Sequence, residues 1–235
     1  MRIDVWSDVV CPWCYIGKRR LETALEGFEH SDEVEVVWHS YELDPSAPSV
    51  PSETMAEVLA KKYGGGVEGA KQMMNQVETV AAEEGLRYRL SENLRVNTVD
   101  AHRVLHLALH DGGIALQSAL KEALLREHFE ELRNVADHDT LVEIAVAVGL
   151  DAARVREVLD GKEFLDEVHA DVAQARAYGA TGVPFFVIDE KYGISGAQPA
   201  QVFSQAIEQA WNESRPTLKM VDADGEACGP DGCAI

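Results

Sequence analysis

Two cysteines separated by two residues are the feature of this sequence best suited to chemistry. Cys11 and Cys14 enclose a Pro-Trp pair and follow a short run of strand-like residues. The thiolate of one cysteine can attack a disulfide bond, and a second thiol one helical turn away can then resolve the mixed disulfide. The spacing therefore indicates a site for thiol–disulfide exchange, with Cys11 as the attacking sulfur and Cys14 as the resolving one.

The residues around the two cysteines predict a strand followed directly by a helix at about 12–28. Arg2 to Trp6 alternates polar and apolar side chains, as a short strand does. Apolar residues then recur at helical spacing: Ile16, Leu21, Ala24, Leu25 and Phe28. Pro12 fits the first helical turn, where its missing N–H group is not needed. We expect Cys11 at the helix N-terminus, where unpaired N–H groups and the helix dipole stabilise a thiolate.

Acidic residues outnumber basic ones by a wide margin. The chain of 235 residues has 21 Lys and Arg against 41 Asp and Glu, a formal net charge of −20. Such a charge argues against nucleic acids and anionic membranes as partners. It also means that a thiolate needs local stabilisation. Lys18, Arg19 and Arg20 lie on the predicted helix and could supply it, although such a row is more often a solvated helix face.

Length and cysteine usage indicate the class of protein and its compartment. The chain is long enough for one large domain or two small ones with a substantial core. Residues 1–10 lack the apolar run of a signal peptide, and no stretch approaches the ~20 apolar residues of a membrane span. Four cysteines in two close pairs do not resemble a secreted disulfide framework. We therefore expect a cytoplasmic protein without a membrane partner.

The predicted elements follow the order β-α-β, a helical block, and then β-β-α. A second strand is expected at 34–38, after which the proline-rich segment 44–51 leaves the sheet. Residues 53–178 show helical periodicity, with glycines between the segments. Strand character returns at 184–188, and Pro199 opens a last helix. This order predicts an α/β fold in which a helical insertion separates two halves of one small sheet.

The predicted domains follow from that order. They are a sheet domain at 1–48 plus 179–214, a helical insertion at 49–178, and a flexible C-terminal tail at 215–235. Within the insertion, Thr140 and Glu143 have the spacing of a capping box, and Asp151 is expected to cap the next helix.

The two motifs together resemble a known family. Cys11-Pro12-Trp13-Cys14 after the first strand, and Thr181-Gly182-Val183-Pro184-Phe185 before the third, resemble the thioredoxin fold. The long helical insertion between them is similar to that of DsbA-like oxidoreductases. The segments 4–8, 15–17 and 97–103 are more similar to the FrnE branch, often called polyketide-synthesis dithiol–disulfide isomerases, which is cytoplasmic. The resemblance covers residues 1–212 and implies a thioredoxin fold with a large all-helical insertion.

The resemblance also implies a role for each residue of the two motifs. Cys11 would be the attacking thiolate and Cys14 the resolving thiol. Pro184 would be a cis-proline that faces the disulfide and helps to seat the substrate chain. Val183 would offer backbone groups for strand-like pairing with that chain. The residues implied to bind the substrate are Pro12, Trp13 and Val183. A Pro-Trp pair differs from the Pro-His pair of periplasmic members, so their strongly oxidising character is not expected here.

The tail carries a second cysteine pair, Cys228 and Cys233, separated by Gly-Pro-Asp-Gly. This turn chemistry allows the two sulfur atoms to approach closely. One interpretation is a second redox pair that exchanges electrons with Cys11 and Cys14, and another is a structural clip or a metal-binding tail. A zinc site shared by all four cysteines would leave the strand–helix placement of Cys11 and the Val-Pro motif unexplained, so we expect no metal.

Two neighbouring residues of the predicted insertion, His102 and Arg103, are weaker candidates. In the glutathione-using relatives the matching region lies beside the active-site groove. An isolated histidine on a helix is more often a hydrogen-bonded structural residue, and we favour that interpretation.

The sequence thus predicts a thiol–disulfide oxidoreductase or isomerase that acts on protein thiols and disulfides or on small thiols, as a monomer or homodimer. No metal or organic cofactor is required, because the cysteine pair is itself the redox centre, and glutathione stays open as a co-substrate. One alternative is a glutathione-dependent isomerase or transferase related to 2-hydroxychromene-2-carboxylate isomerase, although those relatives usually carry Ser in place of Cys11. Another is a chaperone that holds unfolded chains.

Overall fold

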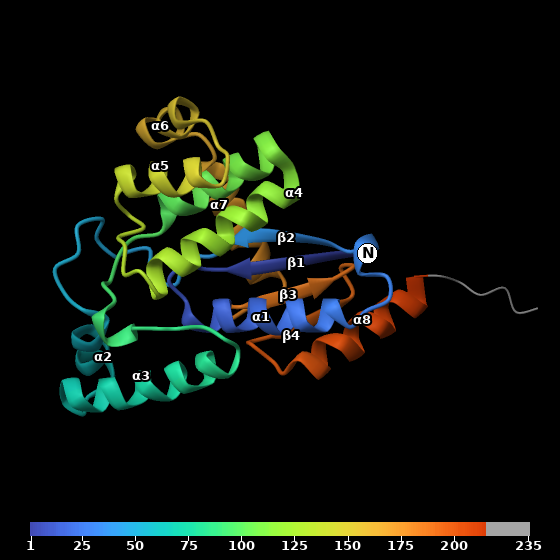
Figure 1. Cartoon of the computed structure of the whole chain (residues 1–235), viewed down its shortest axis with the longest axis horizontal. Helices are drawn as coiled ribbons and strands as arrows, with labels where there is room; N and C mark the ends of the chain where they lie inside the picture. Colours follow the sequence, from blue (N-terminus) through green and yellow to red (C-terminus); the bar gives the residue numbers. More distant parts are fainter. Residues whose placement is uncertain (215–235) are drawn as a thin grey trace, which may run out of the picture.

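A four-stranded sheet forms the centre of the structure, a computed structural model that describes residues 1–214. Its strands are β1 (Arg2–Ser7), β2 (Glu35–Ser40), β3 (Phe185–Ile188) and β4 (Tyr192–Ser195), in the spatial order β2-β1-β3-β4. β1 pairs in parallel with β2 and antiparallel with β3, and β3 pairs antiparallel with β4. The two predicted halves of the sheet therefore meet where β1 pairs with β3 (Figure 1).

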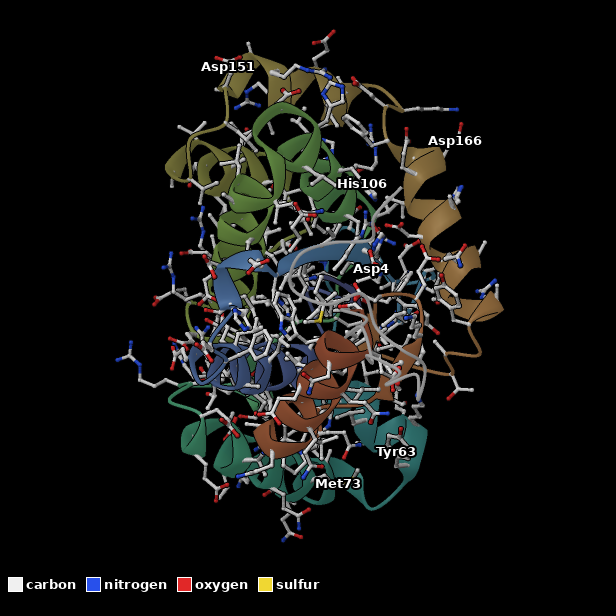
Figure 2. The ribbon with its side chains drawn as sticks, turned by 90° about the vertical axis from the view of Figure 1, so that its right-hand side faces the viewer. Asp4, Tyr63, Met73, His106, Asp151 and Asp166 are labelled. Atoms are coloured by element: carbon white, nitrogen blue, oxygen red, sulfur yellow. The ribbon has the colours of Figure 1, made fainter. Side chains whose placement is uncertain are left out.

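Eight α-helices occur within the described residues. They are α1 (Pro12–Glu26), α2 (Met55–Tyr63), α3 (Gly66–Glu83), α4 (Val99–Phe129), α5 (His138–Ala147), α6 (Ala152–Asp160), α7 (Leu165–Ala177) and α8 (Ala200–Ser214). Short 3₁₀ helices lie at Ser31–Glu33 and Leu90–Glu92. Figure 2 shows Asp151, which precedes α6, and Met73 of α3 at opposite ends of the molecule, with Asp4 of the sheet between them.

This arrangement confirms the predicted α/β fold with helices inserted between the two halves of the sheet. The predicted domain boundaries at 48/49 and 178/179 fall in the connections that join β2 to α2 and α7 to β3.

Alternate strand residues face opposite sides of the sheet and build two cores. On one side, Ile3, Val5 and Phe186 pack with Leu21 of α1 and Phe203 of α8, and each of these side chains is at most 2% exposed. Burying one such side chain contributes roughly 1.5–3 kcal/mol. This core holds α1 against the sheet and so determines where the helix leaves β1.

The opposite side of the sheet packs against the insertion. Trp6 and Phe185 share a cluster with Ala175 of α7, and α4 runs along the edge strand β2 (Figure 1). The amide of Gln117 on α4 completes that edge, because Trp38 N donates to Gln117 Oε1 at 3.1 Å and Gln117 Nε2 donates to Trp38 O at 2.8 Å.

Of two local predictions for the insertion, one is confirmed and one is wrong. The sequence predicts separate helices before and after Gly112-Gly113, and the helical backbone of α4 is broken at Gly113, where φ 71° and ψ −168° are not helical. Gly tolerates this positive φ because it has no Cβ. The capping box predicted at Thr140 and Glu143 is wrong, since the side chain of Asp137 caps α5 by accepting the N–H of Thr140 at 2.8 Å. Asp151 caps α6 as predicted.

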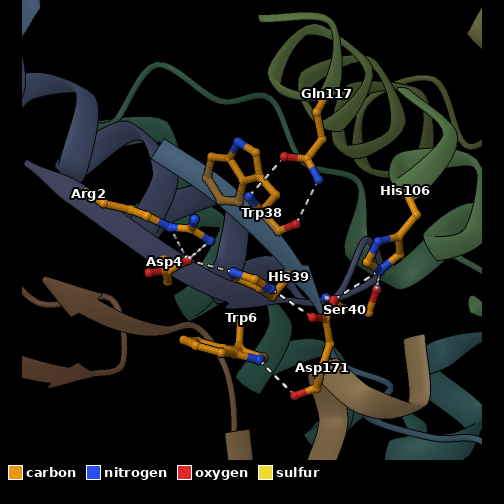
Figure 3. Close-up of polar contacts among 9 residues, drawn as sticks. All are labelled: Arg2, Asp4, Trp6, Trp38, His39, Ser40, His106, Gln117 and Asp171. Atoms are coloured by element: carbon orange, nitrogen blue, oxygen red, sulfur yellow. Dashed lines mark hydrogen bonds and ion pairs between the residues drawn. The ribbon is translucent and has the colours of Figure 1, made fainter. Parts of the chain in front are cut away.

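His39 of β2 joins the insertion to the sheet through two carboxylates. Its Nδ1 lies 2.7 Å from Asp171 Oδ1 on α7, and its Nε2 lies 2.7 Å from Asp4 Oδ1 on β1 (Figure 3). Asp171 also accepts the N–H of Ser40 at 2.7 Å and lies 3.0 Å from Nε2 of His106 on α4. Burial alone would lower the pKa of His39, but the two carboxylates outweigh it and raise that pKa to about 9.

A His39→Gln variant should be less stable than the wild type at neutral pH, and the difference in free energy of unfolding should shrink as the pH rises. The folded pKa of about 9 exceeds the unfolded value of about 6.5, so the stabilisation is complete below the lower value and is lost through the higher one. We expect the variant to unfold on the order of 3 kcal/mol more easily at neutral pH and to approach the wild type above pH ~9.5. Denaturant unfolding across this range measures the difference.

His110→Gln is the matched control, because the exposed ring of His110 pairs with the adjacent Asp111. Parallel pH profiles for the wild type and His39→Gln would contradict the assignment.

Candidate active site

Cys11 stands at the junction of β1 and α1. It directly precedes the first residue of α1 in an extended conformation, with φ −91° and ψ 113°, and its carbonyl accepts the N–H of Cys14 at 3.0 Å. Both cysteines are free thiols. Trp13 between them is 40% exposed, whereas Cys11 and Cys14 are 4% and 1% exposed. The indole of Trp13, rather than either sulfur atom, therefore presents most of the motif's surface to solvent.

Burial makes the Cys14 thiol a weaker acid. It raises the pKa of the Cys14 thiol well above its ordinary value, and the thiol of Cys11 beside it adds to the effect, while the charge of Lys121 opposes both. A thiol that keeps its proton at neutral pH is a poor nucleophile. The geometry therefore favours Cys11 as the sulfur that attacks first and Cys14 as the one that follows.

The loop before β3 lies directly against Cys11. The Val183–Pro184 peptide bond is cis, and Cys11 Sγ lies 3.6 Å from Val183 O. Gly17 lets this loop approach α1 closely, because a Cβ at that position would lie 3.0 Å from Pro184 Cγ and 3.2 Å from Phe186 Cζ. The structure thus brings together two motifs that are 172 residues apart in the chain.

Two buried charged side chains adjoin the cysteine pair. Asp8 is fully buried, accepts the N–H of Leu43 at 2.8 Å and lies 3.3 Å from His102 Nε2. Burial alone would raise the pKa of Asp8, but the contact with His102, the hydrogen bond from Leu43 and the charge of Lys121 together keep that pKa below its ordinary value. Lys121 of α4 is also fully buried, with Nζ 3.4 Å from Ser7 O.

Burial lowers the pKa of Lys121 to about 8, and the charges of Cys14, Asp8 and Cys11 act against this shift. Within residues 1–214, no carboxylate lies close enough to Lys121 Nζ to form an ion pair. A buried cation without an ion-pair partner is unfavourable. Its charge is therefore available to stabilise a thiolate at Cys14.

Comparison with known proteins establishes the family of this chain. A family model described as a DSBA-like thioredoxin domain matches residues 2–208. The chain belongs to this DSBA-like family. It accordingly has the thioredoxin fold, interrupted by the helical insertion described above.

Individual relatives of this DSBA-like protein cover nearly its whole length. A probable DsbA oxidoreductase from Streptomyces coelicolor is 49% identical, with a TM-score of 0.86 over 100% of this chain and 99% of that chain. The uncharacterized protein YwbO of Bacillus subtilis is 29% identical over 212 residues, 88% of this chain and 96% of its own length. The cytosolic disulfide reductase DsbM from Pseudomonas aeruginosa, solved with GSH, shares the fold at 16% identity, with a TM-score of 0.64 over 90% of this chain and 100% of its own.

The basic residues that follow the motif are engaged by carboxylates. Lys18 is 4% exposed and pairs with Glu122 at 2.6 Å. Arg19 pairs with Glu22 at 2.7 Å and also with Glu122, and Arg20 pairs with Glu84 at 2.6 Å. These residues therefore tie α1 to α4 and α3, and they form neither a solvated face nor a free positive charge for Cys11.

Of the two weaker candidates, His102 lies at the site of this DSBA-like protein and Arg103 does not. His102 is fully buried beside Asp8. Arg103 donates to backbone carbonyls that follow α6, with Nε 2.8 Å from Glu163 O and a terminal nitrogen 2.9 Å from Gly161 O. Arg103 is therefore a structural residue of the insertion.

Sequence reasoning missed three contributors to the site, Asp8, Lys121 and Tyr88. Tyr88 OH donates to Pro12 O at 2.8 Å and so anchors the motif to the insertion. Asp8 stands three residues before Cys11, which is a usable signal for a buried partner. Lys121 lies among leucines on α4, and nothing in the sequence distinguishes it from a solvated lysine.

Cys228 and Cys233 lie outside the described residues. Within residues 1–214, no group of three or more His, Cys, Asp or Glu side chains is arranged to hold a metal ion. A helix long and apolar enough to cross a membrane is likewise absent from this part of the chain.

Gly17→Ala should impair disulfide exchange more than it impairs stability. The added methyl must displace Pro184 or Phe186, which typically costs about 1–3 kcal/mol, while Ala favours the helix by about 1 kcal/mol. We expect a several-fold fall in kcat/KM with a test disulfide such as insulin, and a net loss of stability of roughly 0–2 kcal/mol, which lowers the melting temperature by at most about 8 °C. Gly69→Ala in α3 is the control, because a Cβ there meets nothing within 4 Å. Equal activities of the two variants would show that close approach to Pro184 is unimportant.

Proposed function

We propose that this chain is an enzyme, a thiol–disulfide oxidoreductase or isomerase of the FrnE branch, which exchanges disulfides with protein or small-thiol substrates. One observation carries the proposal: a free Cys11 thiol lies at the start of α1, 3.6 Å from Val183 O, with the Cys14 thiol buried behind it. Membership of the DSBA-like family and 49% identity to a probable DsbA oxidoreductase support it.

The reaction consists of two exchanges between sulfur atoms. The Cys11 thiolate attacks a substrate disulfide, forms a Cys11–substrate mixed disulfide and expels one substrate thiolate, which takes a proton from water. Cys14 then loses its proton and attacks Cys11 Sγ, so that the second substrate thiolate leaves and a Cys11–Cys14 disulfide remains. The substrate gains two electrons and the protein loses two. The same steps in reverse oxidise a substrate dithiol.

The surfaces beside Cys11 suit an extended substrate chain. Val183 O lies at the reacting sulfur, and a backbone carbonyl in this place can accept a hydrogen bond from a chain that pairs as an added strand. The exposed indole of Trp13 offers an apolar contact next to it. We assign substrate binding to Pro12, Trp13, Val183 and Pro184.

Lys121 has an electrostatic role in the second exchange. Cys14 must ionise to attack, and its burial opposes ionisation. The Lys121 ammonium is the buried cation that favours the Cys14 thiolate, and the thiolate in turn favours the ammonium. This mutual stabilisation would lower the barrier to resolving the mixed disulfide.

The proposed exchange needs no metal or organic cofactor, and glutathione is proposed as a small-thiol co-substrate. The protein is proposed to act in the cytoplasm as a monomer or homodimer. The closely spaced cysteine pairs support a reducing compartment. The presence of Cys11 favours this reaction over the isomerase or transferase alternative. A chaperone would not need the cysteine pair.

We also propose that Cys228 and Cys233 exchange electrons with Cys11 and Cys14. The chain length permits this contact. Cys228 follows Ser214 by 14 residues, which can span at most ~48 Å. The distance to cover exceeds the ~22 Å length of α1, because α8 ends beyond the end of α1 that lies away from Cys11 (Figure 1).

Cys14→Ser should trap a mixed disulfide on Cys11, because the resolving thiol is missing while the attacking one is intact. Cys11→Ser should form no such adduct and should lose insulin reduction by several orders of magnitude. Intact-protein mass spectrometry after incubation with oxidised insulin measures the adduct. Insulin reduction that persists in Cys11→Ser would refute the proposed reaction. Suppressed aggregation without reduction in that variant would identify a separate chaperone activity.

Lys121→Met should shift the second exchange to higher pH. Loss of the ammonium removes the charge that favours the Cys14 thiolate, and each unit added to the pKa of Cys14 slows resolution about tenfold near pH 7. Stopped-flow measurement of mixed-disulfide resolution from pH ~6 to ~10 records the shift. Met also removes the hydrogen bond to Ser7 O and the contact with the Trp38 ring, so thermal unfolding is measured to show that the variant is folded. An unshifted profile in a folded variant would exclude Lys121 from this role.

A further inference from the structure

A charged cavity of about 320 Å³ lies beside α2, outside the cysteine site. It is lined by Asp44, Glu53, Val58, Lys61, Lys62 and Arg95. Asp44 and Glu53 belong to the connection between β2 and α2, and Arg95 follows the 3₁₀ helix at Leu90–Glu92. The cavity is more open than enclosed, so a group bound there stays in contact with solvent.

The cavity is lined by elements at the same end of the molecule as the cysteine motif. Figure 1 shows α2 and the connection before it at the end of the sheet where α1 begins. The link is also direct in the chain: Asp8 O accepts the N–H of Cys11 at 3.3 Å, and Asp8 Oδ2 accepts the N–H of Leu43, the residue before Asp44, at 2.8 Å. The connection that carries Asp44 is therefore held to the start of α1 through Asp8.

The cavity lining has one more basic side chain than carboxylates, and that basic side chain has no ion-pair partner in the described part of the chain. Arg95 pairs with Asp44 at 2.6 Å, and Lys61 pairs with Glu53. Lys62 contacts the ring of Tyr63 at 5.3 Å and, within residues 1–214, has no carboxylate at ion-pair distance. This local excess of positive charge occurs in a chain with a net charge of −20. An entering carboxylate would meet Lys62, and the aliphatic stem of that side chain could lie on Val58.

We propose that this cavity binds an acidic side chain of the substrate polypeptide, and that Lys62 is the residue that selects it. The inference rests on the proposed function, since it places the substrate's cysteine at Cys11. An extended chain advances ~3.4 Å per residue, so a spacing of roughly two to four residues covers about 7–14 Å from that cysteine. Glutamate fits better than aspartate, because its longer stem reaches both Val58 and the ammonium.

Paired disulfide peptides that differ only in Glu or Gln test this selection. The Glu is moved through each position from about two to four residues on either side of the cysteine. At one spacing we expect kcat/KM to be ~2–5-fold higher for Glu, the range for a solvent-accessible ion pair. The preference should vanish in about 1 M salt, where the Debye length is ~3 Å. Lys62→Gln should bring the ratio to about one.

Lys71→Gln is the matched control and should keep the wild-type ratio, because Lys71 lies on α3, pairs with Glu68 and does not line the cavity. Binding of the same peptides with Ser in place of Cys, measured by calorimetry, separates the subsite from the chemistry. If the Glu peptide binds more tightly and Lys62→Gln abolishes the difference, the subsite is supported. If no disulfide is exchanged at the same time, only the proposed function is refuted. Equal binding of Glu and Gln peptides at every spacing overturns the subsite, as does a preference that survives in Lys62→Gln.

Discussion

The antiparallel pairing of β1 with β3 is the constraint on which the rest of the site depends. The register places Trp6 opposite Phe185, so the end of β1 and the start of β3 meet. Cys11 follows the first and Pro184 precedes the second, and Cys11 Sγ therefore reaches Val183 O. Because both strands are buried in the same two cores, the relative position of the cysteine and the proline loop is fixed by packing as well as by backbone hydrogen bonds.

The helical insertion does more than cover the sheet. It supplies Tyr88, which holds the carbonyl of Pro12, and Lys121 and His102, which flank Asp8 beneath the motif. Burying these charges is unfavourable by itself, and it becomes tolerable because Asp8 is hydrogen-bonded and Lys121 lies near sulfur atoms that can ionise. The proposed chemistry and the fold are linked through these residues, since the insertion must dock before the site has its charge.

Electrostatics in this acidic protein are local. The basic row after the motif is neutralised by Glu22, Glu84 and Glu122. His39 carries its charge between two carboxylates. It has no part in the proposed exchange, but it helps to hold the insertion against the sheet. Within residues 1–214 no carboxylate forms an ion pair with Lys121 or Lys62, and each of them also lies where a negatively charged group is proposed to come.

The sequence by itself determined the order of elements, the motif at the start of α1 and the family. Alternation in Arg2–Ser7, helical spacing after Cys14 and Pro12 in the first turn are local signals, and local signals are what side-chain periodicity records. The capping box failed because Asp137 competes for the same N–H, a choice that adjacent residues alone do not settle. Only the tertiary structure decided which charges adjoin the sulfur atoms. Asp8 and Lys121 are far apart in the chain, so only folding brings them together. The sequence also does not show whether a lysine on a helix faces water or a thiol, because burial is a property of the packed molecule.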